Sequence, residues 1–344
     1  MSKKLLGVID ATAYFSNLDR LISRRSLAAL PFGGKYRLID FILSNMVNSG
    51  IDSVAIFTKA PYCSLLDHVG SGEYWDLNRK RDGLFLFPLL TEDFRGRRVG
   101  LFDHFAAYLD FFYRSSQEYA LIANCYTIAN IDFRKILKAH RKSGTEITVI
   151  KKDGVSLEMY LLKTSLLISL IESRKRTGYG NMADVIADMN CPYLVNTYEY
   201  EEPAVMIDSV KAYYNTSMKL LKQEMRNSLF KVHMPIYTKV RDEPPTICTR
   251  SCTVTNSLMA NGCRIEGIVE NSIIFPGVKV EEGAVVRNSI IMQDGVIEAD
   301  SYLESVILDK NITVKKGAAL TGSKKHPQVI AKGITVSCGA VMKP

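Results

Sequence analysis

Asn271-Ser272-Ile273-Ile274 is one of four related segments near the C-terminus of this chain. The others are Asn256-Ser257-Leu258-Met259, Asn288-Ser289-Ile290-Ile291 and Glu304-Ser305-Val306-Ile307, and successive segments start 15, 17 and 16 residues apart. Short aliphatic strands joined by Gly or Asn turns at this spacing are typical of hexapeptide repeats, with about three hexads to a coil. One such coil cannot bury its apolar face alone, so the coils must stack. We therefore predict a left-handed parallel β-helix over residues 251–344; an ordinary β-sandwich would not repeat at this interval.

The chain before these repeats has a different sequence pattern. Up to about residue 230, strand-like and helix-like patterns alternate. We predict strands at 5–9, 53–58, 119–123, 146–150 and 193–200, and helices at 35–48, 105–116, 133–142, 182–189 and 209–225. Such alternation indicates an α/β domain, with a Rossmann-like, mostly parallel sheet covered by helices on both faces. We place this domain at 1–235 and a linker, which contains Pro244-Pro245, at 236–250.

Composition narrows the class of protein. A hydrophobic fraction of 47% and a charged fraction of 23% are ordinary for a globular protein. No apolar run approaches the roughly 18 residues that a membrane span needs, and the start resembles no signal peptide, so we expect a cytoplasmic protein without membrane contact. The seven cysteines include no Cys-x-x-Cys pair, which favours free thiols over a metal site. The net charge of +8 fits anionic small molecules or an acidic partner, and no basic block is long enough to favour nucleic acid.

The turn after the first predicted strand lacks a feature that nucleotide-binding enzymes of this architecture need. Parallel sheets bind ligands at the C-terminal ends of their strands, and glycines there let backbone N–H groups approach a phosphate. Here residues 10–20 read Asp-Ala-Thr-Ala-Tyr-Phe-Ser-Asn-Leu-Asp-Arg, without a glycine. The bulky Tyr14 and Phe15 would obstruct a phosphate, and we expect both rings to fill the space that a triphosphate would take.

Several motifs together identify a family. They are Pro31-Phe32-Gly33-Gly34-Lys35-Tyr36-Arg37-Leu38-Ile39-Asp40-Phe41, Leu43-Ser44-Asn45, Asn48-Ser49-Gly50-Ile51, Ser64-Leu65-Leu66-Asp67-His68, Trp75-Asp76-Leu77-Asn78-Arg79 and Pro235-Ile236-Tyr237-Thr238. In this order they resemble ADP-glucose pyrophosphorylase (glucose-1-phosphate adenylyltransferase) over nearly the whole chain. The resemblance implies a nucleotidyltransferase domain followed by a β-helix. It also implies a tetramer that makes ADP-glucose from ATP and glucose 1-phosphate and is regulated by phosphorylated metabolites.

The chain departs from that family at its catalytic positions. The family's phosphate-loop lysine, four residues before the Pro-Phe-Gly-Gly motif, corresponds to Leu27. The first metal-binding aspartate of the family corresponds to Tyr126 and the second to Met206. In nucleotidyl transfer, Mg²⁺ held by two carboxylates neutralises the charge that builds on the phosphate oxygens. Tyrosine and methionine side chains do not replace these hard oxygen ligands. We therefore expect no catalytic residues, no metal site and no cofactor in this chain.

A further departure lies between Ile150 and Tyr160. The family has a longer region there, with a lysine that binds the sugar phosphate, whereas this chain passes directly from Lys151-Lys152-Asp153-Gly154 to Ser156. Either the sugar-phosphate element is deleted or the sequence omits a segment.

A scaffold kept without its catalytic groups resembles the family's non-catalytic, GlgD-type subunits. The resemblance implies a regulatory subunit that joins a catalytic ADP-glucose pyrophosphorylase subunit, which carries the Mg²⁺, in a hetero-tetramer; whether the chain also self-associates stays open. One alternative is a divergent but active sugar-phosphate nucleotidyltransferase, in which Asp132 and Asp208 move in as metal ligands, although Asp132 more simply caps a helix. Another alternative is a metabolite sensor without an enzyme partner.

Basic residues near the Pro-Phe-Gly-Gly motif are candidates for binding a regulatory anion. Arg24, Arg25, Lys35 and Arg37 fall within a short stretch, and arginine suits bidentate recognition of phosphate. In the resembling family, basic residues at this block bind phosphorylated effectors at the interface with the β-helix, and Lys35 and Arg37 correspond to them best. The alternative is a solvated basic face, or an Arg37 paired with a helix carboxylate.

Overall fold

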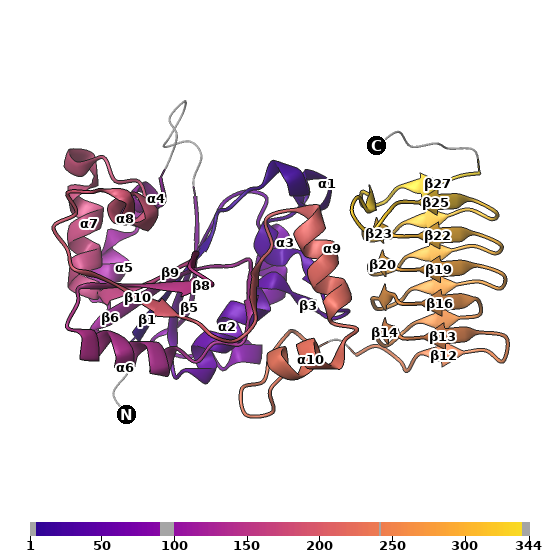
Figure 1. Cartoon of the computed structure of the whole chain (residues 1–344), viewed down its shortest axis with the longest axis horizontal. Coiled ribbons are helices and arrows are strands. Elements are labelled where there is room, and N and C mark those ends of the chain that lie inside the picture. Colours follow the sequence, from indigo (N-terminus) through magenta and orange to yellow (C-terminus); the bar gives the residue numbers. More distant parts are fainter. Residues whose placement is uncertain (1–4, 90–99, 241, 339–344) are drawn as a thin grey trace.

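The computed structural model describes residues 5–89, 100–240 and 242–338, so the outer ends of the two predicted domains, at 1 and 344, lie outside the described residues. A domain of helices around a sheet stands beside a column of short stacked strands (Figure 1). Among the described residues, no helix is long and apolar enough to cross a membrane.

The larger domain is built on a seven-stranded sheet with the order β10-β8-β9-β6-β1-β4-β5. All neighbours in it are parallel except β9, which runs antiparallel to both β6 and β8. The sheet is therefore mostly parallel, as predicted. Its strands are β1 (Leu5–Ala11), β4 (Ser53–Thr58), β5 (Gly83–Pro88), β6 (Tyr119–Asn124), β8 (Ile147–Lys152), β9 (Val155–Lys163) and β10 (Val195–Glu199). Two small pairs add β2 (Pro31–Phe32) with β3 (Tyr36–Arg37), and β7 (Thr127–Ala129) with β11 (Ala204–Met206).

Helices cover both faces of this sheet. Along β1 the side chains alternate: Leu5 and Ile9 join one buried core, while Leu6 and Val8 join the other. The helices are α1 (Asp19–Ile22), α2 (Leu38–Asn48), α3 (Cys63–Val69), α4 (Leu101–Ala107), α5 (Leu109–Arg114), α6 (Phe133–Ser143), α7 (Thr164–Thr177), α8 (Met182–Ala187), α9 (Val210–Lys219) and α10 (Gln223–Leu229). Short 3₁₀ turns lie at η1 (Ser16–Leu18), η2 (Leu27–Ala29) and η3 (Glu73–Trp75).

Local signals explain where several helices begin and end. The side chain of Asp132 accepts the backbone N–H of Arg134 and caps α6, and Gly144 ends this helix with a φ of 67°. The predicted helices 105–116 and 209–225 are each split into two, α4 with α5 and α9 with α10. Helix α2 starts at Leu38 rather than at Lys35, because Gly33 and Gly34 both adopt positive φ and turn the chain back to pair β2 with β3.

Between Ile150 and Tyr160 the chain forms a tight hairpin. Lys152 pairs with Val155, and the two turn residues, Asp153 and Gly154, have φ values of 49° and 76°. Two successive left-handed residues of the type Asp-Gly are the signature of a two-residue hairpin turn. The chain therefore continues directly from β8 into β9, and a two-residue turn stands where the resembling family has a longer region.

The second domain is a left-handed parallel β-helix of three sheets (Figure 1). Its first strand, β12 (Ile247–Cys248), lies inside the span predicted as linker. One sheet holds β12, β15 (Arg264–Ile265), β18 (Lys279–Val280), β21 (Val296–Ile297), β24 (Thr313–Val314) and β27 (Thr335–Val336). A second holds β13 (Thr253–Thr255), β16 (Ile268–Glu270), β19 (Val285–Arg287), β22 (Tyr302–Glu304) and β25 (Ala319–Thr321). The third holds β14 (Leu258–Met259), β17 (Ile273–Ile274), β20 (Ile290–Ile291), β23 (Val306–Leu308) and β26 (Gln328–Ile330).

The repeated Asn-Ser pairs have a structural role at one corner of the coils. Asn256, Asn271 and Asn288 all adopt left-handed φ values between 44° and 48°, which asparagine tolerates better than most residues. The serine that follows links the coils, since the hydroxyl oxygen of Ser272 accepts the N–H of Ser289 at 3.1 Å. In each repeat the asparagine therefore forms a turn, and the serine forms a ladder of hydrogen bonds between coils.

Candidate functional site

The site to be tested is the C-terminal edge of strands β1 and β6, where the resembling family holds its triphosphate. After β1, the N–H and the hydroxyl of Thr12 both donate to Oδ1 of Asp10, at 2.8 and 2.7 Å. In a phosphate-binding turn such backbone donors face the ligand. Here the carboxyl group of Asp10 accepts from Thr12 and takes the place of the phosphate. Burial raises the pKa of Asp10, against the lowering effect of its bonds to Thr12.

The two positions that correspond to the metal aspartates lie side by side. Met206 is in register with Thr127 across β11 and β7, and the N–H of Ile207 donates to the carbonyl of Tyr126 at 2.9 Å. The two residues that the resemblance assigns to the metal positions are therefore neighbours in space, although they lie far apart in the sequence. Neither holds a carboxylate.

Tyr126 is buried, and contacts on several sides fix its side chain. Its hydroxyl donates to the Glu158 carboxylate, and its ring packs edge-on against Phe15 with 5.1 Å between centroids. Burial and the hydrogen bond to Glu158 both raise the pKa of the phenol, so it is a neutral donor rather than an anionic oxygen ligand. Met206 is half-buried and packs against the same core, and Leu27 lies within it at 1% exposure. All three positions serve packing.

Only one of the two aromatic residues after β1 fills this space. Phe15 packs against the core through Tyr126, but Tyr14 is 53% exposed, and its hydroxyl donates to Asp19 at 2.7 Å. The expectation that both rings occupy the triphosphate volume is therefore wrong for Tyr14. Its ring lies instead near Lys59, whose ammonium is 5.8 Å from the ring centroid.

The side chains of Tyr126 and Met206 do not supply the carboxylate oxygens that magnesium prefers. Among the described residues, no group of three or more His, Cys, Asp or Glu side chains is placed to hold a metal. Asp132, one of two substitute ligands considered, is engaged as the cap of α6 and in an ion pair with Arg134 at 2.8 Å. Asp208, the other, is exposed at the start of α9, two residues beyond Met206.

The four candidate anion-binding residues do not form one cluster. Arg25 is buried and forms a bidentate ion pair with Asp309 of the β-helix, at 2.8 and 2.7 Å, so the prediction that it binds a regulatory anion is wrong. Arg37 is also buried, and its guanidinium donates to the Ser64 carbonyl. This contact ties Arg37 to α3, and its binding of a regulatory anion stays a prediction. Arg24 is exposed.

Lys35 lines a cavity between the domains. This interdomain cavity has a volume of about 470 Å³ and is bordered by Gly33, Gly34, Lys35, Thr238, Lys239, Val240, Glu243, Leu258, Met259, Ala260, Asn261, Pro276 and Gln293. Two buried polar atoms of the lining, Thr238 Oγ1 and Gln293 Oε1, have no hydrogen-bond partner within the protein. Lys239, which the sequence reasoning missed, also lines the cavity, and its ammonium group donates to the Asp67 carbonyl at 2.8 Å and pairs with the Asp67 carboxylate at 3.4 Å. The Lys35 ammonium group and the two unsatisfied polar atoms make this cavity suited to a polar ligand, and the lining also carries the acidic Glu243.

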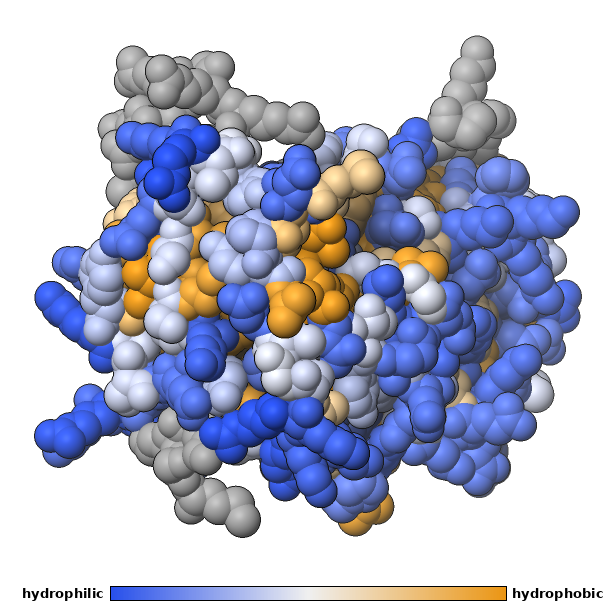
Figure 2. Space-filling view, turned by 60° about the vertical axis from the view of Figure 1, so that its left-hand side comes forward, coloured by the Kyte–Doolittle hydropathy of each residue, from blue (hydrophilic) through white to orange (hydrophobic). Residues whose placement is uncertain are grey.

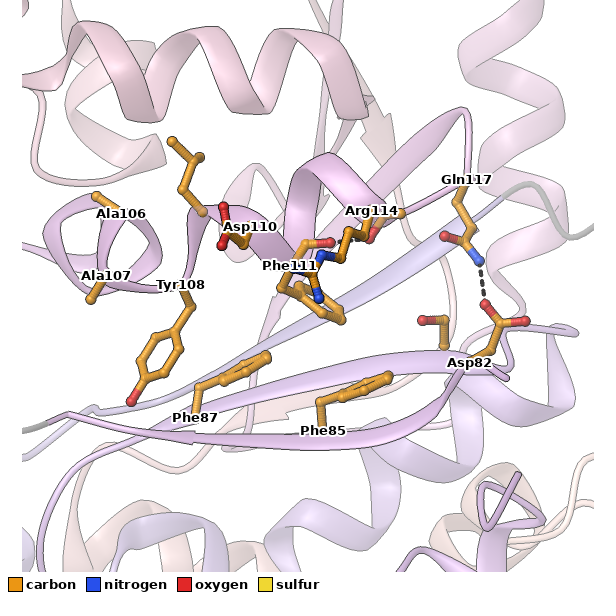
Figure 3. Close-up of a pocket in the computed structure, with 13 residues that line it drawn as sticks. Asp82, Phe85, Phe87, Ala106, Ala107, Tyr108, Asp110, Phe111, Arg114 and Gln117 are labelled. Carbon is orange, nitrogen blue, oxygen red and sulfur yellow. Dashed lines mark hydrogen bonds between the residues drawn. The ribbon is translucent and has the colours of Figure 1, made fainter. Parts of the chain in front are cut away.

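Another cavity lies at the edge of the sheet that is formed by β5, between this strand and the bend where α4 meets α5. It measures about 640 Å³ (Figure 3). Phe85 and Phe87 form its floor with nearly parallel rings, 6.3 Å apart, and Phe111 packs against both. Gln117 donates to Asp82 at 3.0 Å at one end of it. Apolar patches bordered by hydrophilic side chains are visible on the face turned forward in Figure 2. This cavity carries no catalytic arrangement.

Comparison with known proteins agrees with this architecture. Residues 18–156 match the nucleotidyl transferase family, and residues 244–341 match the GlmU-like, C-terminal hexapeptide family. A glucose-1-phosphate adenylyltransferase of Thermomicrobium roseum is 33% identical over 95% of this chain and 87% of its own length. The chain belongs to the glucose-1-phosphate adenylyltransferase family.

Within the glucose-1-phosphate adenylyltransferase family, the similarity is higher to proteins named GlgD. The "Glycogen biosynthesis protein GlgD" of Geobacillus stearothermophilus is 54% identical, and that of Bacillus subtilis (strain 168) is 45% identical. Each comparison covers 97% of both chains. The resemblance predicted from the Pro-Phe-Gly-Gly motif and its companions, including the GlgD-type assignment, is thereby confirmed.

Proposed function

We propose that this chain is a regulatory subunit without adenylyltransferase activity of its own. It assembles with a catalytic glucose-1-phosphate adenylyltransferase, as a hetero-tetramer in the cytoplasm, and acts in glycogen synthesis. The proposal rests first on Tyr126 and Met206, which lie side by side and which the family resemblance assigns to the positions of the metal carboxylates. The role in glycogen synthesis is supported by the names of its full-length relatives.

The chemistry of the reaction explains why this observation carries weight. Attack of a sugar phosphate on the α-phosphorus of ATP builds negative charge that needs a divalent cation held by hard oxygen ligands. A methionine thioether is a soft ligand, and the Tyr126 phenol is already committed as a donor to Glu158. The Asp10 carboxyl group, bonded to the Thr12 N–H, also competes with any phosphate for the turn after β1. Three independent features thus disfavour binding of magnesium and ATP.

The interdomain cavity is the physical basis for the regulatory part of the proposal. We assign the interdomain cavity, with Lys35 and Lys239 on its wall, as the place where a phosphorylated metabolite binds. The cavity lies between the Gly33-Gly34 turn and the third sheet of the β-helix, so a ligand there contacts both domains. A ligand that binds one relative arrangement of the domains better than another shifts their equilibrium, and this can pass to a bound partner.

The experiment measures the catalytic partner with and without this chain. A catalytic adenylyltransferase is assayed alone, with the wild-type chain, and with the Lys35→Gln and Lys239→Gln variants, each over a series of fructose 1,6-bisphosphate and inorganic phosphate concentrations. We expect the wild-type chain to co-elute with the enzyme and to change its rate or effector response. The two lysine variants should still co-elute but shift the effector midpoint, whereas Arg24→Gln on the exposed surface should not. Failure of the wild-type chain to associate or to alter the kinetics would contradict the proposal.

An active but divergent enzyme is the alternative. It would need Asp208 to turn toward Met206 and bring a carboxylate to the metal position. This alternative predicts turnover by the isolated chain that disappears in Asp208→Asn.

A further inference from the structure

The open end of the β-helix carries a cysteine at an interior position. In the first sheet, Cys248 of β12 is in register with Ile265, which is in register with Val280. Ile265 and Val280 are buried in the core of the β-helix, at 0% and 1% exposure. Cys248 therefore occupies the same inward-pointing column. It is exposed because β12 is the terminal strand of its sheet.

A second cysteine occupies the neighbouring inward position of the same coil. The N–H of Cys252 donates to the carbonyl of Thr249 at 3.3 Å and closes a turn. The same turn recurs in other coils, where Ala284 donates to Glu281 and Ala318 to Lys315, at 3.2 and 3.0 Å. Both alanines are buried, and each follows the inward valine of its coil by four residues, Val280 and Val314 respectively.

The end coil thus holds two thiols where two other coils hold a Val and Ala pair, Val280 with Ala284 and Val314 with Ala318. Cys252 packs half-buried against the core of the β-helix, and the turn closed by its N–H on Thr249 brings it to the interior corner next to Cys248. Burial and the neighbouring thiol raise the pKa of Cys248, so this thiol is protonated at neutral pH. Cys263, the nearest other cysteine, is buried, and its thiol donates to the carbonyl of Phe275 at 3.2 Å.

We propose that Cys248 and Cys252 form a reversible intramolecular disulfide that closes the open end of the β-helix. The oxidant is a low-molecular-weight disulfide. One cysteine loses its proton and attacks that disulfide, which releases one thiol and leaves a mixed disulfide. The second cysteine then loses its proton and displaces the other thiol as the new S–S bond forms. Two cysteine thiols are oxidised, one small disulfide is reduced to two thiols, and no further reactant is needed. Exposure of Cys248 gives the small molecule access.

The test treats the full-length folded chain with oxidised glutathione, blocks the remaining thiols by alkylation, and maps the tryptic peptides by mass spectrometry. Trypsin cuts at Arg250, between the two cysteines, so their disulfide appears as a linked pair of the peptides 242–250 and 251–264. We expect this pair in the wild-type chain and its loss after treatment with dithiothreitol.

Variants identify the bond, and they use residues that other coils carry at the same places. Cys248→Val and Cys252→Ala should each abolish the linked pair. Cys263→Val, which matches Val278 of the next coil, and Cys63→Ser on α3 should both retain it. The proposal is overturned if the wild-type chain yields only glutathione adducts or no linked pair. It is also overturned if the pair survives in Cys252→Ala or disappears in Cys263→Val.

Discussion

The ion pair between Arg25 and Asp309 should be a main contributor to the attachment of the β-helix to the larger domain. Both side chains are nearly excluded from solvent, with exposures of 5% and 3%, and two N–H···O contacts of 2.8 and 2.7 Å join them. Removing one partner of a buried pair leaves the other charge desolvated and unpaired. Such a change typically costs about 3–5 kcal/mol. We therefore expect Arg25→Met and Asp309→Asn each to lower the folding equilibrium constant by about two to four orders of magnitude.

The assay is urea unfolding at neutral pH, followed by circular dichroism and by the fluorescence of Trp75, the single tryptophan of the chain. Arg24→Met is the matched control, because Arg24 is the adjacent residue and is exposed. It should change the free energy of unfolding by no more than about 0.5 kcal/mol. The double variant Arg25→Met/Asp309→Leu removes both charges and should be less destabilised than either single variant. If Arg25→Met unfolds at the same urea concentration as Arg24→Met, the ion pair does not contribute as argued.

Two further changes probe the hairpin and the buried histidines. Gly154→Ala should destabilise the chain by about 1 kcal/mol, because the φ of 76° at this turn position disfavours a Cβ, and a thermal unfolding midpoint equal to wild type would contradict the turn assignment. The pKa values of His68, His104 and His140 are lowered mainly by burial, for His104 to about 4, so below pH 6.5 the unfolded chain binds more protons than the folded one. Stability should therefore be complete above pH 6.5 and decline as the pH falls from there toward 4. His104→Phe should flatten this decline in urea unfolding measured between pH 7.5 and 5, and an unchanged slope would show that His104 does not contribute to it.

The β-helix was predictable because its signals are local. The Asn at each corner marks a left-handed turn, and the Ser and aliphatic residues after it repeat with every coil. The hairpin at Asp153-Gly154 also had a local signal, since this dipeptide favours a two-residue turn. The turn was not predicted, because this stretch was interpreted only as the place of a longer region in the family. Strand β5 was missed because periodicity alone does not distinguish a short apolar run in a strand from one in a buried helix.

In the candidate site, too, features with a local or motif signal were predictable and contacts between distant segments were not. The motif spacing assigned Tyr126 and Met206 separately to the two metal positions, and the structure places these two residues side by side. The anion-binding prediction treated nearby positions in sequence as a cluster in space. The prediction was wrong for Arg25 because its partner Asp309 lies 284 positions further along the chain. No local sequence pattern predicts a contact at that separation. Lys239 was missed for the same reason, since it reaches the interdomain cavity from the linker.

The central claim is that this chain retains the nucleotidyltransferase scaffold without its magnesium and triphosphate site. The most direct measurement is turnover by the purified chain alone, with ATP, glucose 1-phosphate and Mg²⁺, followed by the release of pyrophosphate. We predict no turnover above that of a Tyr126→Phe/Asp208→Asn variant, which lacks both the phenol and the one nearby substitute carboxylate. Robust turnover by the wild-type chain that is lost in this variant would contradict the account.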